Sequence, residues 1–573
     1  MAKFIKRNAI VISMTSYPAR INCVYDAFKS IIEQDVDKSL YHCVLVLAEP
    51  EFPNKKDDLP ENLIQLMKDN DIELIWTEKN IMSHKKLMPT LAKYKKNPIL
   101  IVDDDVTRPQ GWLETFMHDH EKWPNDIICG TFAYHYVPDT GFKRFSNVKL
   151  ERAQTFNDVP AIVFNTARPA NGFGGVLYPV GTFNRPEFFD EDLFMKLSPT
   201  SDESWQFCFN IMEDRHLRQL SKVYDYSKNF IGDTQSMKTA LHKVNKNKYE
   251  SIFKTLCEVF PEFKEKMLER SRRVVISLTT YPKRFEHLVE VLDTLVNQTV
   301  MPYKILLVID KPNIEYITPE IVDYIAAHQD LIEVILSENP IKPHEKYYFA
   351  MQKYRYCSVI TVDDDVLYDK RLVEKLLESY NQDPSRIHAA RVHKITFDKN
   401  GVRPYKSWIY QYNSSDINPS HTLFATGVGG VLYPPDCLDI SEDNLPEIQE
   451  FLLADDIYLK KLEMEKNLKV VFVPGIRNKE FKQKDYKDYS ALYKINVVEN
   501  KNDEYLSKID FSGIADETNR KPGILSFHAK TNPNNILLVG SDDIRSKTMV
   551  FKSKYTPATP KKPVMVFKTK SKV

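Results

Sequence analysis

The sequence predicts an α/β protein with two consecutive doubly wound domains, each built on a mostly parallel sheet, followed by a basic C-terminal tail. Apolar runs of strand length alternate with stretches of helical periodicity along most of the 573 residues. Such alternation implies parallel strands joined by helical crossovers. The same motifs occur twice in the same order, and the chain after Asp543 has no acidic residue but many lysines.

Three motifs carry the internal repeat. The matched pairs are Ile12–Arg20 (ISMTSYPAR) with Ile276–Arg284 (ISLTTYPKR), Ile99–Val106 (ILIVDDDV) with Val359–Val366 (VITVDDDV), and Gly174–Pro179 with Gly429–Pro434 (both GGVLYP). The period is far longer than the repeat unit of a solenoid, so it indicates duplication of a whole domain. We predict domains at residues 1–268 and 269–510, and a C-terminal extension at 511–573 that includes the basic tail.

Each copy yields its elements in the order of a doubly wound sheet. In the first copy we expect strands at 9–13, 42–48, 72–76 and 99–102, and helices at 21–32, 62–68 and 85–94. In the second copy we expect strands at 274–277, 305–309, 332–336 and 359–362, and helices at 288–296 and 321–327. The strands are short apolar runs, which suits parallel strands buried on both faces. The second half of each copy is less regular and carries the glycine turn and a later acidic pair.

Composition favours an ordinary soluble globular protein, with 42% hydrophobic and 28% charged residues. No apolar run approaches the ~20 residues of a membrane helix, and the first residues lack the features of a secretory signal. The seven cysteines are scattered without a Cys-x-x-Cys pair, which indicates a reducing compartment. We therefore expect a cytoplasmic protein, with a basic tail that can contact the inner face of an anionic membrane or a nucleic acid. A solvated tail that only keeps the protein soluble is the alternative.

Two aspartate triads, Asp103–Asp105 and Asp363–Asp365, directly follow predicted strands. Ligands of open α/β sheets bind at the carboxyl ends of the strands. Three adjacent carboxylates repel one another unless a cation or hydrogen-bond donors hold them, and a hard divalent ion prefers such oxygen ligands. The triads therefore predict a site for Mn²⁺ or Mg²⁺ that holds a diphosphate. An acidic loop that faces water is the structural alternative.

Other polar residues are expected at the same sheet edges. In the first copy they are Thr15, Arg20, Glu49, Lys86, the Asn171–Gly175 turn, Asp202 and Glu203; in the second they are Thr279, Arg284, Asp310, Lys346, the Gly427–Gly430 turn, Asp455 and Asp456. Arginine and lysine neutralise phosphate oxygens, glycine permits close backbone approach, and a late carboxylate removes a proton from an incoming hydroxyl. The set predicts transfer of a group from a nucleoside diphosphate.

The same residues have structural explanations that the sequence leaves open. The lysines are typical of exposed helix positions, and the arginines are typical of ion pairs with acidic residues of a helix. The glycine turns are typical of places where the chain changes direction. The late acidic pairs suit a helix N-terminus, where the helix dipole favours negative charge.

The ordered motifs resemble glycosyltransferases of the GT-A (Rossmann-like) fold. The order Asp-Asp-Asp, Gly-x-Gly-Gly, Asp-Asp is similar to fringe-type β-1,3-glycosyltransferases, and ISLTTYPKR resembles bacterial sugar transferases of capsule and lipopolysaccharide gene clusters. The resemblance covers about residues 8–250 and 273–500. It implies two tandem GT-A-like domains that use nucleotide-sugar donors.

The resemblance also implies a role for each residue. Asp103 and Asp363 would face the donor ribose or the metal, and Asp104, Asp105, Asp364 and Asp365 would form the metal site. Thr15, Arg20, Glu49, Lys86, Gly174 and Gly175 would bind the donor, as would Thr279, Arg284, Asp310, Lys346, Gly429 and Gly430. One acid each of Asp202/Glu203 and Asp455/Asp456 would be the catalytic base of an inverting transfer. His528 is a candidate metal ligand, because fringe-like enzymes supply a histidine after the acidic pair.

The predicted function is a tandem or bifunctional metal-dependent hexosyl- or pentosyltransferase that acts on a glycan or lipid-linked acceptor. Differences between the copies, such as Glu203 against Asp456, indicate two specificities or one copy reduced to a scaffold. A nucleotidyltransferase is one alternative, although the loop after the first strand has no glycine. A non-catalytic carbohydrate- or nucleic-acid-binding protein is the other.

Overall fold

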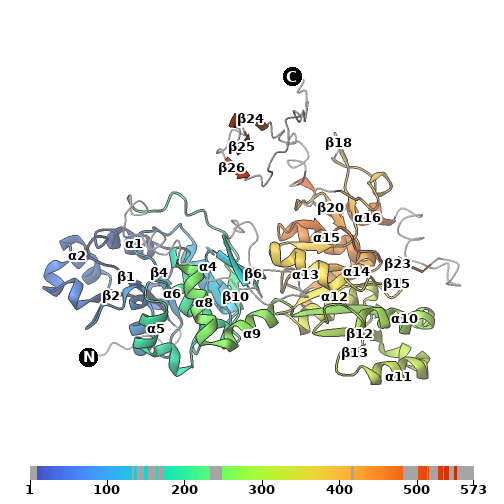
Figure 1. The fold of residues 1–573 in the computed structure, drawn as a ribbon, viewed down its shortest axis with the longest axis horizontal. Helices are drawn as coiled ribbons and strands as arrows, with labels where there is room; N and C mark the ends of the chain where they lie inside the picture. The colour runs from blue at the N-terminus through green and yellow to red at the C-terminus, as the bar shows by residue number, and fades with distance from the viewer. Residues whose placement is uncertain are drawn as a thin grey trace, which may run out of the picture. The chain divides into compact units, whose positions relative to one another are not determined.

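The computed structural model describes residues 9–131, 134–138, 148–152, 163–164, 170, 172–232, 248–399, 401–414, 418–481, 501–512, 514, 527–532, 535–540 and 548–551. The chain divides into two compact units, Met1–Phe511 and Ser512–Val573. The first unit contains two large sheets (Figure 1). We call residues 9–270, with the first sheet, the first module, and residues 274–511, with the second sheet, the second module.

The sheet of the first module has the strand order β3-β2-β1-β4-β9-β5-β10-β8. Its strands are β1 (Ile10–Thr15), β2 (Tyr41–Ala48), β3 (Glu73–Thr77), β4 (Ile99–Val102), β5 (Ile127–Cys129), β8 (Val163–Phe164), β9 (Val176–Tyr178) and β10 (Leu217–Gln219). Strand β1 pairs in parallel with β2 and β4, whereas β9 runs antiparallel between β4 and β5. A separate antiparallel pair is formed by β6 (Tyr134–Pro138) and β7 (Val148–Arg152).

The sheet of the second module repeats this order as β13-β12-β11-β14-β21-β16-β22. Its strands are β11 (Val274–Thr280), β12 (Lys304–Asp310), β13 (Ile332–Ser337), β14 (Ser358–Thr361), β16 (Ile387–Ala389), β21 (Val431–Tyr433) and β22 (Val470–Phe472). Three antiparallel pairs of short strands lie outside it: β15 (Val366–Leu367) with β23 (Lys479–Glu480), β17 (Val392–Lys394) with β20 (Leu423–Ala425), and β18 (Phe397–Asp398) with β19 (Gly401–Val402). The predicted α/β class, with two mostly parallel sheets, is confirmed.

Helices occupy the crossovers between the strands. In the first module they are α1 (Cys23–Ile32), α2 (Glu61–Asp69), α3 (Met88–Lys93), α4 (Trp112–Lys122), α5 (Glu191–Leu197), α6 (Asp202–Met212), α8 (Tyr249–Val259) and α9 (Pro261–Arg270). In the second they are α10 (Phe285–Val296), α11 (Pro319–Ala327), α12 (Glu345–Lys353), α13 (Leu372–Gln382), α14 (Leu445–Glu450), α15 (Asp455–Glu465) and α16 (Lys501–Leu506). Each module has its own buried apolar core between sheet and helices.

One predicted helix is interrupted. Residues 85–94 form the end of the 3₁₀ turn η4 (Met82–Lys86) and then α3, which has Pro89 in its first turn. Proline has no backbone N–H and is tolerated only at the start of a helix, so a new helix begins there. The second copy has no proline at this point, and α12 runs unbroken from Glu345.

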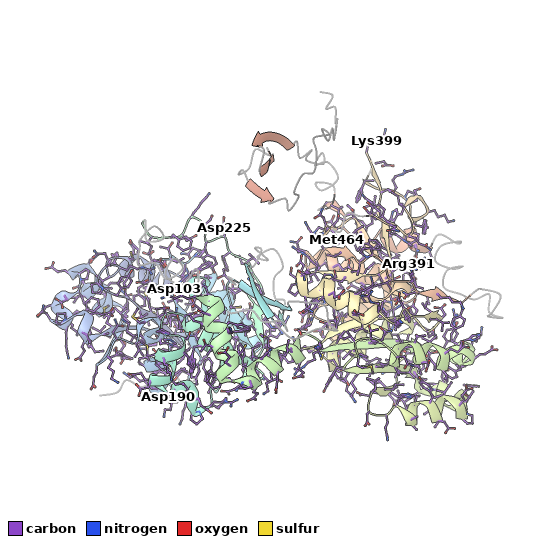
Figure 2. All side chains as sticks on the ribbon, in the orientation of Figure 1. Asp103, Asp190, Asp225, Arg391, Lys399 and Met464 are labelled. Atoms are coloured by element: carbon purple, nitrogen blue, oxygen red, sulfur yellow. The ribbon has the colours of Figure 1, made fainter. Side chains whose placement is uncertain are left out.

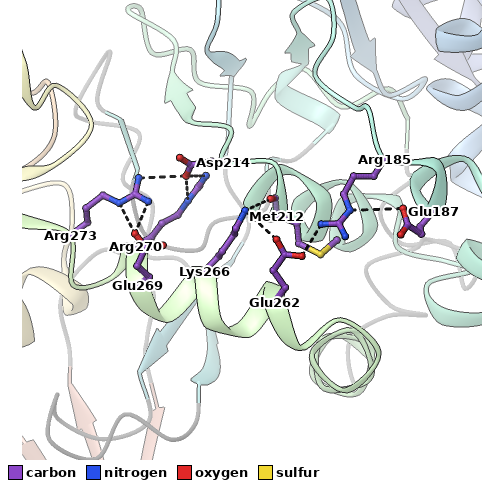
Figure 3. Close-up of polar contacts among 9 residues, drawn as sticks. All are labelled: Arg185, Glu187, Met212, Asp214, Glu262, Lys266, Glu269, Arg270 and Arg273. Atoms are coloured by element: carbon purple, nitrogen blue, oxygen red, sulfur yellow. Dashed lines mark hydrogen bonds and ion pairs between the residues drawn. The ribbon is translucent and has the colours of Figure 1, made fainter. Parts of the chain in front are cut away.

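Helix α9 is the last helix before the second module, and Figure 3 shows the polar contacts of its side chains. Its Arg270 binds Asp214 over 2.7 Å, and the Nζ atom of Lys266 donates to the Met212 carbonyl over 2.5 Å. Only 2% of Arg270 is exposed. These contacts attach α9 to the first module, and β11 begins at Val274. The predicted start of the second domain, residue 269, lies in the last turn of α9.

The second unit contains a three-stranded antiparallel sheet of β24 (Phe527–Asn532), β25 (Asn535–Gly540) and β26 (Thr548–Phe551). Strand β26 lies within the predicted basic tail, and residues 552–573 lie outside the described residues. Within the described ranges, no helix combines the length and the apolar composition needed to cross a bilayer.

Candidate active sites

The first aspartate triad lies where β4 leaves the core. Strands β2, β1 and β4 are parallel neighbours, so their carboxyl ends meet at one edge. The side chain of Asp103, labelled in Figure 2, accepts a 2.9 Å bond from Lys86. Asp104 is 3.0 Å from the Arg20 guanidinium, which also pairs with Asp105. The predicted convergence of Arg20 and Lys86 on this triad is therefore present.

Lys86 also joins the triad to the late acidic pair. Its Nζ atom is 3.2 Å from Asp202 Oδ2, and Asp202 is the first residue of α6. Only 4% of Lys86 and none of Asp202 is exposed. A helix N-terminus favours an acid at this position, so the structural explanation and the lysine bridge coexist.

The second module repeats this bridge. The Nζ atom of Lys346 is 2.6 Å from Asp363 and 2.8 Å from Asp455, the first residue of α15. The next residue, Asp456, accepts a 3.0 Å bond from the backbone N–H of Gly427. In each module, one buried lysine thus holds together the end of a central strand and the start of a helix about a hundred residues later.

The third aspartates of the two triads differ in exposure. Asp105 has a side chain only 5% exposed and pairs with Arg20. Asp365 pairs with Arg284 over 3.0 Å, and 31% of its side chain is exposed. The carboxylate of the second triad is therefore the more accessible one.

The middle aspartates are buried, and burial raises the pKa of both carboxyls. The pKa of Asp104 rises to about 7, although Arg20 acts against the rise. The pKa of Asp364 also rises to about 7, through burial and then the charge of Asp365. The Ser16 hydroxyl donates to Asp104 over 2.5 Å.

The two acids of each late pair have opposite pKa shifts. Burial acts to raise the pKa of Asp202 and of Asp455, but the charge of the bridging lysine lowers both below the usual value. Burial and then the charge of the neighbouring first acid raise the pKa of Glu203 and of Asp456 to about 8. The first acid is thus a fixed anion paired with lysine, and the second is the one able to gain and lose a proton near neutral pH.

In each module, one glycine of the turn lies against a charged side chain of the site. A Cβ atom on Gly172 would lie 2.6 Å from Asp103 Oδ1, and one on Gly427 would lie 2.7 Å from Lys346 Nζ. The glycines singled out from the sequence lie against other groups. Their nearest neighbours are Thr131 for Gly174, Trp112 for Gly175, Arg391 for Gly429 and Leu372 for Gly430. Asn171 lies outside the described residues.

Glu49 and Asp310, the acids expected at the ends of β2 and β12, are not at equivalent positions of the two sheets. Register pairs Thr15 with Val46 and Thr279 with Val308, so the counterpart of Asp310 is Ala48. The predicted equivalence of Glu49 and Asp310 is wrong by one residue, because the short indel between the copies lies before this strand end. Glu49 forms an exposed ion pair with Lys55 over 2.9 Å.

The threonines at the ends of the first strands donate to the neighbouring strands. Thr15 Oγ1 donates to the Val46 carbonyl over 2.7 Å, and Thr279 Oγ1 donates to the Val308 carbonyl over 3.2 Å. Thr279 also donates to Glu345 over 2.9 Å.

Sequence reasoning missed the side chain that ties each triad to its glycine turn. In the first module Arg108 donates to the carbonyls of Asp103 and Phe173. In the second, Tyr368 accepts from the Asp363 N–H over 2.7 Å and lies 3.4 Å from the Val428 carbonyl. Both residues follow the third aspartate by three positions, but their chemical difference hides the equivalence in the sequence.

The donor set fits a divalent cation. Within the described ranges, no group of three or more His, Cys, Asp or Glu side chains forms a metal cluster. However, the side chains of Asp363 and Asp365 are 29% and 31% exposed, and Asp364 Oδ2 is buried without a hydrogen-bond partner in the described part of the chain. Mg²⁺ sites that bind nucleotides use one or two carboxylates with phosphate oxygens and water. His528 lies on β24 in the second unit, and its side chain is outside the described atoms.

Comparisons with known proteins address the class of the second module. Residues 276–432 match the family model described as Glycosyl transferase family 2. This segment contains the second triad, Lys346 and the Gly427–Gly430 turn. The match supports a glycosyltransferase domain there. No curated protein matches the chain.

Several solved structures align with part of the chain. A structure of GalNAc-T7 with UDP, GalNAc and Mn²⁺ is 13% identical, with 41% of this chain and 50% of that chain covered and a TM-score of 0.30. A structure of S. aureus TarS 1–349 with UDP is 14% identical, with 38% of this chain and 59% of that chain covered and a TM-score of 0.26. A structure of the mannosyltransferase PcManGT from Pyrobaculum calidifontis with GDP-Man and Mn²⁺ is 14% identical, with 35% of this chain and 55% of that chain covered and a TM-score of 0.23. The chain thus spans about half the length of the first of these proteins.

Proposed function

We propose that each module is a metal-dependent glycosyltransferase that transfers a sugar from a nucleoside-diphosphate sugar to a hydroxyl of a glycan or lipid-linked acceptor. The observation that carries the proposal is the lysine bridge between the triad and the late acidic pair, present in both modules (Lys86 and Lys346). The family match to residues 276–432 supports the same activity in the second module.

The first part of the site binds the donor. Asp363 and Asp365, with Asp103 and Asp105 in the first module, would hold Mn²⁺ or Mg²⁺. When bound, that cation supplies positive charge that neutralises the diphosphate leaving group. Lys346 keeps Asp363 oriented, and Arg284 lies 3.0 Å from Asp365, where its guanidinium adds a fork of N–H donors for phosphate oxygens.

The second part of the site activates the acceptor. Asp456 in the second module and Glu203 in the first have a pKa of about 8, which is close to the value that suits a general base at neutral pH. Asp455 and Asp202 position the lysine instead. A single base that deprotonates the acceptor while the diphosphate leaves implies inversion at the anomeric carbon.

The experiment measures release of nucleoside diphosphate from a panel of nucleotide sugars with Mn²⁺. Asp105→Ala and Asp365→Ala are compared singly and together, on the full chain. Loss of one activity in each single variant and of both in the double variant supports two active modules. Full activity in the double variant overturns the proposal, and release of pyrophosphate instead would identify a nucleotidyltransferase.

A further inference from the structure

The two aspartate triads differ in how their carboxylates are neutralised. The first aspartates are alike, because Asp103 and Asp363 each pair with the bridging lysine and have side chains 28% and 29% exposed. The difference is confined to the second and third aspartates of each triad. These two carboxylates therefore decide how readily each triad accepts a further cation.

In the first module one arginine contacts both of these aspartates. The Arg20 guanidinium lies 3.0 Å from Asp104 Oδ1 and also pairs with Asp105. The other oxygen of Asp104 accepts a 2.5 Å bond from the Ser16 hydroxyl. The side chains of Asp104 and Asp105 are only 6% and 5% exposed. Both carboxylates are thus covered and already have partners, and Arg20 is their counter-ion.

A second arginine adds positive charge to the first triad. Arg108, which is only 4% exposed, donates to the Asp103 carbonyl over 3.2 Å, and its charge interacts with Asp103 and Asp105. The corresponding residue of the second module is Tyr368. Burial raises the pKa of the Tyr368 hydroxyl well above its usual value, so this side chain is uncharged at neutral pH. The buried charge of Arg108 repels any further cation at the first triad.

In the second module the middle aspartate keeps an oxygen atom available. Arg284 pairs with Asp365 over 3.0 Å, and 31% of the Asp365 side chain remains exposed. Asp364 is 8% exposed, and its Oδ2 atom is buried without a hydrogen-bond partner in the described part of the chain. A buried acceptor without a partner is costly, and a divalent cation that prefers oxygen ligands removes that cost. The second triad therefore favours a cation more than the first does.

A diphosphate changes this balance in the first module. Phosphate oxygens accept paired hydrogen bonds from a guanidinium, so the diphosphate of a donor gives Arg20 a second anionic partner. Arg20 is then able to release Asp105 without leaving its own charge unpaired, and the carboxylate becomes available to a cation.

We propose that Arg20 is an internal counter-ion that keeps divalent metal out of the empty first site. The first module takes up its cation only together with the diphosphate of the donor, whereas the second module binds a cation without a donor. Linkage is reciprocal, so the cation strengthens nucleotide binding more in the first module than in the second. This inference concerns the regulation of the proposed sites and rests on the proposed function.

The test counts the Mn²⁺ ions retained by the full chain in equilibrium dialysis, which does not depend on turnover. Without nucleotide, the chain should retain one ion, and Asp365→Asn should abolish this retention whereas Asp105→Asn should not. With a saturating mixture of UDP, GDP, CDP and ADP, the unchanged chain should retain two ions. Asp105→Asn should then remove the additional one.

Arg20→Met should raise the Mn²⁺ affinity of the empty first site about tenfold or more, within the usual range of coupling between two sites. The reason is that the substitution removes the cation held by Asp104 and Asp105. Arg185→Met is the matched control, because the Arg185 guanidinium pairs with Glu262 of α9. The count on the unchanged chain decides the question even where the Arg20→Met chain does not fold.

Equal or stronger Mn²⁺ retention by the empty first site overturns the inference, as does the absence of retention by both empty sites. A first site that stays empty with the nucleotides present also overturns it, and so does an unchanged affinity in folded Arg20→Met. Absence of Mn²⁺ from both sites in the presence of the nucleotides overturns the proposed function itself.

Discussion

Lys346 Nζ lies 2.8 Å from Asp455 Oδ2, inside a site where 5% of the lysine and 7% of the aspartate are exposed. The two residues are separated by more than a hundred positions in the chain. Their ion pair brings the first residue of α15 to the carboxyl edge of the sheet, and it leaves the adjacent Asp456 beside the triad.

Lys346→Met should destabilise the second module. The substitution leaves Asp455 buried without its cation, and breaking one side of a buried pair costs about 3–5 kcal/mol. The measurement is urea unfolding of the full chain. Lys311→Met is the control, because its ion pair with Glu338 is exposed and should contribute about 1 kcal/mol or less. Equal effects of the two substitutions would contradict a structural role for the bridge.

Asp456→Asn should lower turnover by the second module about 10²–10⁴-fold, which is the usual contribution of a general base. Nucleotide binding should persist, because Asp456 acts on the acceptor. The comparison uses chains in which Asp105→Ala has disabled the first module. Asp455→Asn is the matched variant, and it should also reduce protein stability because it removes the partner of Lys346. If the Asp456→Asn variant has a normal turnover rate, another group must be the general base.

The unliganded protein should lose stability as the pH rises from about 4 to 8. Burial and neighbouring acids raise the pKa values of Glu203 and Asp456 to about 8 and those of Asp104 and Asp364 to about 7. A carboxyl group with a raised pKa in the folded state stabilises the protein below its unfolded pKa, and that contribution is lost as the pH rises through the folded value. Each group changes the unfolding free energy by at most about 1.4 kcal/mol per pH unit.

Asp202 and Asp455, whose pKa values are lowered, affect stability in a different pH range. Their stabilising contribution is lost only as the pH falls below about 4. Urea unfolding at several pH values between 5 and 8 checks the prediction. The double variant Glu203→Gln with Asp456→Asn should show a flatter dependence than the unchanged chain. An unchanged slope would mean that these acids are ionised in the folded protein.

Gly430→Ala should destabilise the second module more than Gly401→Ala. Both glycines have positive φ, +89° and +113°, so both substitutions strain the backbone by about 1–3 kcal/mol. A Cβ atom on Gly430 would also lie 2.9 Å from Leu372, whereas nothing lies within 4 Å at Gly401. The difference between their unfolding free energies therefore isolates the packing clash. Equal values would show that Leu372 moves away at no cost.

Local sequence was enough to predict the strands, the doubled module and the edge of the sheet that carries the triads. Apolar runs such as Ile99–Val102 are read directly from residue type, because burial in a parallel sheet demands them. The copy-to-copy match also identified Lys86 with Lys346 and Arg20 with Arg284. The interrupted helix at Pro89 and the equivalence of Asp310 with Ala48 were not found, because they depend on a local break and on a short indel.

The sequence by itself determined which residue types gather at the two sheet edges, since strand ends and turn motifs are local features of the chain. Only the tertiary structure decided which group each of these residues contacts. It showed that the first acid of each late pair binds the bridging lysine, and that the second is buried beside it, where burial and the first acid raise its pKa. It also revealed that Arg20 contacts both Asp104 and Asp105, whereas Asp364 keeps a buried oxygen without a hydrogen-bond partner among the described residues. Burial and through-space charge set these properties, and both depend on residues far apart in the chain.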